Sequence, residues 1–548
     1  MKNNHRGTEV TELEIPKGAV LSRAACFVRH VTMRVFNCLI EEKTMHMQGG
    51  RRMRERANAA SRQAGITDSR ATTILSVGAC ALFTVLILSG CTVGPKYVRP
   101  DTTVPEAWNN EPREGPTAEE TDPRALAVWW GTLNDATLTG LIERAVVGNL
   151  DLMEAKARVR EARARRSIQK SGLFPSLEAA GSAQARRSSE ETGGGKTSEL
   201  YAVGFDAAWE VDVFGGLRRG VEAADADLEA TNDDLRDTLV TLVAEVALNY
   251  IETRTFQARL SVAEANLEAQ AQTHQLTEWR FQAGLSDELA VQQARYNMEN
   301  TRSQMPALRS SLEESKNRLA VLLGEQPGAV HAELEETRPI PVPPPEIAVG
   351  VPADLLRRRP DVHRAERELA AQTARIGEAT ADLYPKFSLL GSIGLESLSM
   401  GSLFAAGSRT YNVGPTITWP IFRAGAIRQN IEVESALQEQ ALHRYEEAVL
   451  TALEEVENAL VAFAEEQNRR QSLDRATEAA ERAVKISQHQ YEAGQTDFNS
   501  VLISQRSLLS LQDQLTESEG AVTGNLVRLY KALGGGWSSS ASDGQKSG

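Results

Sequence analysis

The feature that most constrains this chain is an internal repeat with one constant offset of 210 residues. One such match could arise by chance, but four matches spread over a whole unit indicate two copies of one module. The Pro-rich stretch 337–352 links the copies. The matches are Asp151 and Ala155 with Asp361 and Ala365, Phe174-Pro175 with Tyr384-Pro385, Arg280–Gly284 with Gln490–Gly494, and Leu323-Gly324 with Leu533-Gly534.

Each copy contains a segment with the alternation typical of a strand. Apolar side chains occupy every second position of residues 201–213, and small or acidic side chains lie between them. Residues 411–419 repeat the pattern more weakly, and a preceding strand is predicted to start at Phe174 or Tyr384. The chain is therefore expected to hold four strands.

Each copy also contains long helical stretches. Residues 216–278 and 426–490 lack Pro, and at about 1.5 Å per residue each would form a rod of roughly 90 Å. Apolar residues recurring at sevens in both rods are typical of coiled-coil seams. Each rod ends at an Ala-Gly pair, so Gly284 and Gly494 are predicted to be the tips of helical hairpins. The predicted helices are about 140–172, 216–278 and a return helix to 323, then about 354–383, 426–490 and a return helix to 533.

Four strands with one apolar face cannot leave their edges open, least of all in a membrane. Several chains could remove those edges by closing one barrel, and three chains would give a twelve-stranded pore. Asp206, Glu210 and Asp212 alternate with the apolar face and are expected to line its lumen. Trp209 and Trp419 are expected near the bilayer boundary as aromatic anchors.

The N-terminal part contains a predicted export signal. Residues Ala71–Gly90 carry no charge, and the sequence LSGC that ends at Cys91 resembles a bacterial lipobox, with Cys91 as acyl acceptor. Thr92, in place of Asp, favours the outer membrane. A transmembrane anchor is the alternative, because the run could span a bilayer. Residues 66–90 are interpreted as a lipoprotein signal peptide, and 1–65 as an extension from an upstream start.

Composition argues against catalysis and nucleic-acid binding. The chain has 60 basic and 74 acidic residues, and residues 1–90 hold 13 and 7 of them, so the rest carries 47 and 67, or net −20. Phosphate contacts need clustered Lys and Arg, so nucleic acid is not an expected partner. No Cys follows Cys91, and no catalytic or metal-binding motif occurs, so no enzyme, metal site or cofactor is expected beyond the lipid.

Four stretches resemble those of outer-membrane factors of tripartite efflux systems. The resemblance is to the NodT-type lipoprotein branch of a TolC/OprM-like family, and it covers all of the main body. The matching stretches are CTVGPKYVRP at 91–100, 129–164 from WWGTLNDATL onward, VPADLLRRRPDVHRAE at 351–366, and LYKALGGGW at 529–537.

The resemblance implies an α+β membrane protein that forms a homotrimer. It implies a twelve-stranded outer-membrane barrel, four strands per chain, continued by a helical coiled-coil tunnel in the periplasm. A periplasmic adaptor and an inner-membrane RND transporter would deliver drugs or other small molecules to this passive duct. The corresponding domains are 91–336 for the lipidated start and first copy, 353–537 for the second copy, and 538–548 for a disordered tail.

Functional residues are expected at the hairpin tips. In relatives the second hairpin closes the periplasmic end, and the positions that face this constriction correspond to Asn499 and Ile503. The acidic residue that some relatives have at the second position is absent, so a ring of Ile503 would close the pore by apolar contact. Packing of Ile503 in a helical seam is the alternative. Gly284 and Gly494 mark the expected docking point of the adaptor.

Two other functions remain open at this point. The first is a duct for type I protein secretion with the same fold. The second is a lipid-tethered periplasmic coiled-coil protein that does not span the membrane, against which the alternating strands argue. The run Arg357-Arg358-Arg359-Pro360-Asp361 is interpreted as a helix start whose Arg side chains pair with acidic neighbours, and not as an anion site.

Overall fold

The computed structural model describes residues 92–101, 104–109, 116–117, 123–344, 347–348, 352 and 358–537. All of them belong to Ser89–Gly548, the second of two units into which the chain divides. Cys91, the predicted signal peptide, the extension 1–65 and the tail 538–548 lie outside the described residues. The predictions made for them remain predictions.

The two copies fold into the same elements, and the offset of 210 residues is kept at both ends of four element pairs. The pairs are α5 (Leu150–Ser171) with α10 (Pro360–Ala381), β2 (Ser176–Arg187) with β5 (Lys386–Ser397), α7 (Gly216–Gln282) with α11 (Ala426–Glu492), and α8 (Glu288–Leu322) with α12 (Phe498–Ala532). The strands β3 (Thr197–Val211) and β6 (Arg409–Thr418) complete the copies. The shorter elements are β1 (Pro116–Thr117), α3 (Pro123–Ala127), η1 (Trp129–Leu133), α4 (Ala136–Gly148), α6 (Glu190–Gly193), β4 (Ile347–Ala348), η2 (Met400–Ser402) and η3 (Ala406–Ser408).

The first helix of each copy differs from its predicted bounds. The stretch 140–172 is two helices, because Asn149 ends α4 and its side chain accepts a hydrogen bond from the backbone N–H of Leu152 to begin α5. The Asn149 amide also donates to the Leu322 carbonyl at 2.9 Å, which ties the break to the end of α8. In the second copy α10 begins at Pro360, as the Pro-Asp pair predicted, and not at 354.

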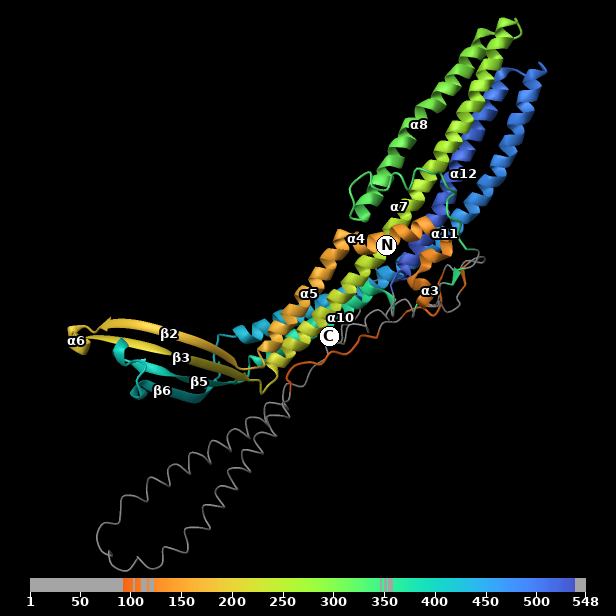
Figure 1. The fold of residues 1–548 in the computed structure, drawn as a ribbon. Coiled ribbons are helices and arrows are strands. Elements are labelled where there is room, and N and C mark those ends of the chain that lie inside the picture. Colours follow the sequence, from red (N-terminus) through yellow and green to blue (C-terminus); the bar gives the residue numbers. More distant parts are fainter. Residues whose placement is uncertain are drawn as a thin grey trace, which may run out of the picture. The chain divides into compact units, whose positions relative to one another are not determined.

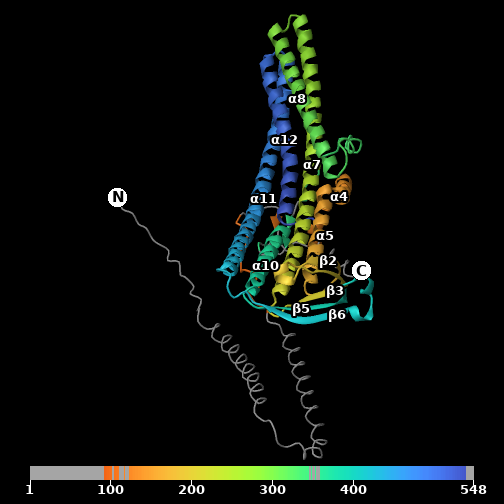
Figure 2. The same cartoon turned by 90° about the vertical axis from the view of Figure 1, so that its left-hand side faces the viewer.

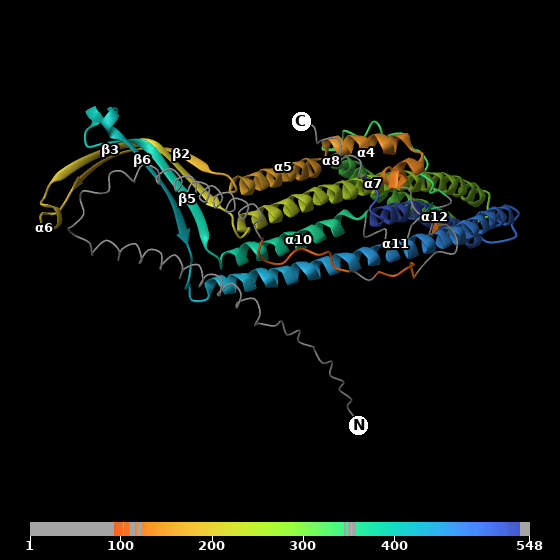
Figure 3. The same cartoon turned by 90° about the horizontal axis from the view of Figure 1, so that it is seen from below.

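The helices beside the sheet form one layer. α7 contacts α5 and α10, and α10 contacts α11, so the order across the layer is α5, α7, α10, α11 (Figure 3). The rods α7 and α11 continue past this layer, where α8 returns along α7 and α12 packs against both rods (Figures 1 and 2). Across the described ranges, no helix has the length and apolar character needed to cross a bilayer.

The four long strands form one antiparallel sheet in the order β2, β3, β5, β6. The pairing of β3 with β5 joins the two copies, and Gly204 lies opposite Gly394 in this pair. β2 follows α5 and α11 follows β6, so the edge strands of the sheet are continuous with the edge helices of the layer. The chain therefore has two matching open sides.

The main hydrophobic core lies where the four long helices meet α4 and η1. Trp129 stacks on Tyr530 with ring centroids 5.2 Å apart, and the Gly536 N–H donates to the Leu126 carbonyl at 3.0 Å. A Cβ at Gly535 would lie 3.0 Å from Trp129, so Gly permits this close approach. Three of the residues recurring at sevens on α11, Val449, Val456 and Phe463, are buried in this core, which confirms the predicted seam on that helix. On α7 only Leu242 of the predicted seam is buried, and the others, Leu228, Leu235, Leu260 and Leu267, are half-buried.

Candidate functional site

The register of the sheet sorts its side chains into an apolar and a polar face. Direct pairing places Ala179, Phe205, Ile393 and Tyr411 side by side across all four strands. The next residue along each strand forms the row Glu178, Asp206, Ser392 and Asn412 on the opposite face. Phe205, Ile393 and Tyr411 are 53%, 66% and 83% exposed, so none of the described residues covers the apolar face.

The polar face holds two of the three predicted lumen residues. Asp206 and Glu210 lie on it, and Asp206 faces Glu178 across the β2–β3 pair. Asp212 does not, because β3 ends at Val211. The Asp212 carboxylate instead accepts a hydrogen bond from the Arg218 backbone N–H at 2.9 Å and pairs with its guanidinium, at the start of α7. The predicted alternation over 201–213 therefore runs two residues past the end of β3.

The junction between helices and sheet is held by equivalent contacts in both copies. The indole N–H of Trp209 donates to the Leu173 carbonyl at 3.0 Å, and that of Trp419 donates to the Leu383 carbonyl at 3.1 Å. Both tryptophans therefore tie the end of a strand to the preceding helix, which the alternation pattern did not predict. Both keep an apolar ring and a satisfied N–H, as expected at a membrane boundary.

Residues 92–99 pack against the same junction. The Val93 N–H donates to the Phe214 carbonyl at 3.1 Å, and Arg219 donates to the carbonyls of Val93 and Gly94. The Tyr97 hydroxyl donates to Glu366 on α10 at 3.0 Å, and burial raises the pKa of Tyr97. The segment that follows Cys91 is thus fixed across α7 and α10 beside the sheet.

Both hairpins turn as predicted. Gly284 and Gly494 have φ of +72° and +67°, and the N–H of the residue after each donates to a carbonyl five residues back. Asp287 and Asp497 cap the returning helices by accepting from the N–H of Ala290 and Ser500. These caps share the offset of 210 residues and match the Asp preference at helix starts.

The two tips differ in surface chemistry. Trp279, Leu285 and Leu289 on the first hairpin are 60%, 67% and 63% exposed. The equivalent positions on the second hairpin are polar: His489, Gln495 and Asn499. At these three positions the first tip is therefore apolar and the second is polar.

The two predicted gate residues lie on the exposed face of α12. Ile503 is 56% exposed and Asn499 is exposed one turn before it. Phe498, Val501 and Leu502 fill the buried seam of the helix. Ile503 is therefore available for contacts outside its own chain, and packing within this chain does not account for it.

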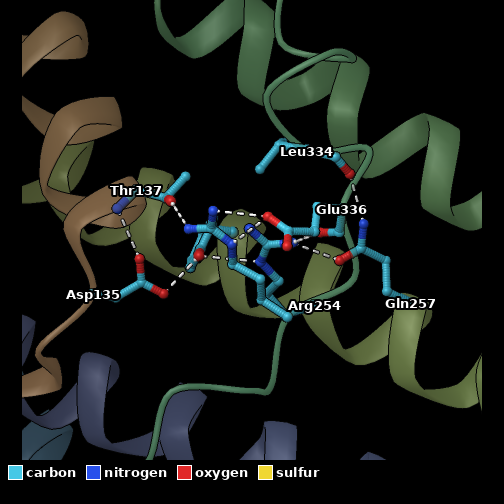
Figure 4. A network of polar contacts seen from close by, with 8 residues as sticks. Asp135, Thr137, Arg254, Gln257, Leu334 and Glu336 are labelled. Carbon is cyan, nitrogen blue, oxygen red and sulfur yellow. Dashed lines mark hydrogen bonds and ion pairs between the residues drawn. The ribbon is translucent and has the colours of Figure 1, made fainter.

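A buried polar network joins α4, α7 and the segment before the Pro-rich link (Figure 4). The Tyr250 hydroxyl donates to Asp135 at 2.6 Å and accepts from Arg254 at 3.0 Å. Arg254 is 0% exposed and also donates to Gln257 and to the Glu336 carbonyl. Burial, together with the hydrogen bond to Asp135, raises the pKa of Tyr250 to about 12.

The RRRPD run forms a second network. Arg359 is buried and binds Asp361 through two nitrogens, at 3.0 and 2.7 Å. It also contacts Glu455 on α11 and the Ala532 carbonyl at the end of α12. The Arg359 guanidinium holds the pKa of Asp361 below its usual range despite burial. The predicted structural role is confirmed for Arg359.

No group of three or more His, Cys, Asp or Glu side chains in the described part of the chain could hold a metal ion.

Known proteins match this chain over nearly all of the part that follows the predicted signal. The protein family described as "Outer membrane efflux protein" matches residues 141–325 and 351–535, two segments that are again 210 residues apart. Nodulation protein T of Rhizobium leguminosarum bv. trifolii is 31% identical over 460 residues, which cover 83% of this chain and 96% of that protein. The toluene efflux pump outer membrane protein TtgC of Pseudomonas putida is 32% identical over 461 residues, covering 83% and 94%.

Solved structures of outer-membrane channels superpose on this chain. The outer-membrane channel OprN superposes with a TM-score of 0.77 at 36% identity, covering 82% of this chain and 100% of that chain. The open state of the MtrE outer membrane channel of Neisseria gonorrhoeae gives a TM-score of 0.72 at 27% identity, covering 82% and 99%.

Proposed function

The chain belongs to the outer membrane efflux protein family, and from this premise we propose that three copies close their sheets into one twelve-stranded barrel. Members of this family are outer-membrane channels of efflux pumps and not enzymes, and this chain is such a channel. The helical layers of the three copies continue the barrel as a tunnel into the periplasm. The adaptor and the inner-membrane transporter supply the solute and the energy.

The observation that carries this proposal is the pair of matching open sides. The edge strand β2 and edge helix α5 lie on one side, and β6 and α11 lie on the other. Open strand edges and an uncovered apolar face are both unfavourable in isolation. Joining β6 and α11 of one copy to β2 and α5 of the next removes the edges and directs the apolar face to lipid.

The faces of β3 provide the direct test of the barrel. Single Cys substitutions at Val203, Phe205 and Ala207 on the apolar face are expected to resist a water-soluble maleimide in intact outer membranes. Substitutions at the polar-face positions Ala202, Asp206 and Ala208 are expected to react, because that face lines a water-filled lumen. Native mass measurement of the detergent-extracted protein should give a trimer. Equal labelling of the two sets would contradict the barrel.

We propose that Asn499 and Ile503 of the second hairpin line the periplasmic constriction. Three Ile503 side chains in apolar contact would oppose opening, and each buried CH₂ contributes about 0.8 kcal/mol. Ile503→Ser should therefore raise the open fraction in single-channel recordings by roughly tenfold or more. Trimer formation should be unchanged.

The matched control for this variant is Ile486→Ser. The Ile486 side chain is 57% exposed, nearly the same fraction as that of Ile503, but it lies on α11 before the tip. Its substitution should leave the recordings as they are. Unchanged conductance and vancomycin resistance in a well-formed Ile503→Ser trimer would show that Ile503 does not close the pore.

Further features of the proposal concern the anchor and the partners. An acyl group on Cys91 would enter the membrane beside the sheet, because the segment from Thr92 onward is fixed there. The mass of the mature N-terminal peptide tests whether Cys91 is acylated.

An adaptor would dock on the hairpin tips, chiefly through the apolar first tip with Trp279, Leu285 and Leu289. The names of relatives mention toluene and cation efflux, which favours small solutes over secreted proteins.

A further inference from the structure

The two open sides of the helical layer carry opposite charge. α5 contains seven basic and three acidic residues, whereas residues 426–457 of α11 contain two Arg and eight Glu. Lys156, Arg160 and Arg163 on α5 are exposed, and none has an ion pair among the described residues. The edges of one chain are therefore complementary to each other, although α7 and α10 separate them.

The repeat shows how such edges would meet. Within the chain, α7 of the first copy packs on α10 of the second, and Arg364 of α10 binds Asp234 of α7 with 2.7 Å between Nη1 and Oδ1. If α11 packs on α5 of the next chain in the same manner, the equivalent positions are found by adding or subtracting 210. Asp234 then corresponds to Arg444, and Arg364 corresponds to Glu154.

Both charges of the ion pair are thus exchanged at once. An acidic residue on α7 becomes basic on α11, and its basic partner on α10 becomes acidic on α5. A change at only one of these positions would have created a like-charge contact, which is unfavourable. The exchange at both keeps an attractive pair at the contact that would lie between chains.

We propose that α11 and α5 of adjacent copies meet in an ionic seam centred on Arg444 of one copy and Glu154 of the next. The occupant of the open α5 edge is a second copy of this chain, and the inference rests on the trimer proposed above. Glu439 is equivalent to Glu229, whose in-chain partner is Arg367 at 3.3 Å. Arg367 corresponds to Ala157, so Glu439 would lie beside Lys156 and Arg160 of the adjacent copy.

Disulfide cross-linking tests the position of this seam. The double variant Arg444→Cys/Glu154→Cys in the full-length lipoprotein is expected to give covalent dimers and trimers on a non-reducing gel after mild oxidation. Each single substitution should give neither. The control is Asp234→Cys/Arg364→Cys, which replaces the equivalent ion pair within one chain. Any disulfide in this variant should join two helices of the same chain, so the mass should stay that of a monomer.

The register is tested by a second pair. Glu161 lies two turns further along α5, so Arg444→Cys/Glu161→Cys should cross-link at least several-fold less than the pair with Glu154. Equal or stronger cross-linking at Glu161 would overturn the proposed pairing while leaving the trimer intact. A protein that forms no trimer by native mass measurement would instead contradict the proposed function itself.

The charge of the seam is tested by the yield of trimer at low and high salt. Arg444→Glu places like charges at each seam and should lower the trimer yield about threefold at low salt. The loss should shrink at about 1 M salt, where the Debye length is near 3 Å. Lys485→Glu on the same helix is the control, because its equivalent, Gln275, makes no hydrogen bond or ion pair within the described ranges. An unchanged yield for Arg444→Glu at low salt would overturn the ionic seam.

Discussion

Replacing Asp135 by Ala is expected to destabilise the folded protein by about 2–4 kcal/mol, because it removes both a helix cap and the acceptor of a buried hydroxyl. Asp135 is the carboxylate that is linked, through the Tyr250 hydroxyl, to the fully buried guanidinium of Arg254. Without it the Tyr250 hydroxyl loses its acceptor and Arg254 retains a buried charge with no linked anion. α4 also loses its N-cap, since Asp135 accepts from the N–H groups of Thr137 and Leu138.

Two controls separate the cap from the network. Asp287→Ala removes an N-cap of the same type at the exposed start of α8, and should cost only about 0.5–2 kcal/mol. Asp135→Asn keeps an acceptor for the cap but removes the charge, so its cost should fall between the two. The measurement is the denaturant midpoint of the purified protein in detergent. Equal midpoints for Asp135→Ala and Asp287→Ala would show that the buried network adds nothing.

Replacing Gly204 by Val is expected to abolish the assembled channel. A Cβ at Gly204 would lie 2.7 Å from the Ile393 carbonyl oxygen and 2.9 Å from the Gly394 Cα, so the backbones of β3 and β5 would have to separate. Overpacking of this kind costs about 1–3 kcal/mol or more. The cost falls on the strand pair that joins the two copies, where no flexible side chain can yield.

Gly391 provides the matched control for this variant. It lies on the same central strand pair, but its Cβ would meet the nearest atoms at 3.7 and 3.8 Å, which is ordinary contact. Gly391→Ala should therefore leave detergent-resistant trimers in outer-membrane fractions at the wild-type amount. Gly204→Val should reduce them to background, and a wild-type amount of Gly204→Val trimer would disprove the close approach of β3 and β5.

Much of the fold follows from patterns that are local in the sequence. The period-two alternation of residues 201–211 sorted β3 correctly into two faces, because a strand alternates wherever it is placed. The Ala-Gly pairs located both tips, because only a residue that tolerates positive φ permits that reversal. The repeat predicted that the second copy has the same elements as the first, and in four element pairs the first and last residues are indeed 210 positions apart.

The local patterns failed at two sites, and a contact with a distant segment contributes at only one of them. Asn149 divides the first helix because its amide reaches the Leu322 carbonyl at the end of α8. Asp212 leaves the strand because Arg218 holds it at the start of α7. The Gly148-Asn149 pair is the local signal that could have located the first of these breaks, because Asn is a preferred N-cap residue.

The sequence by itself thus determined the number of copies, the type and order of their elements, and the exposed positions at the tips. These properties depend on backbone preferences and periodicity over a few turns or strand residues. Only the tertiary structure decided the order α5, α7, α10, α11, the Gly204–Gly394 approach and the Asp135–Tyr250–Arg254 network. The Gly204–Gly394 and Asp135–Tyr250 contacts join residues more than a hundred positions apart. The order of the helical layer depends on the packing of α7 of the first copy against α10 of the second.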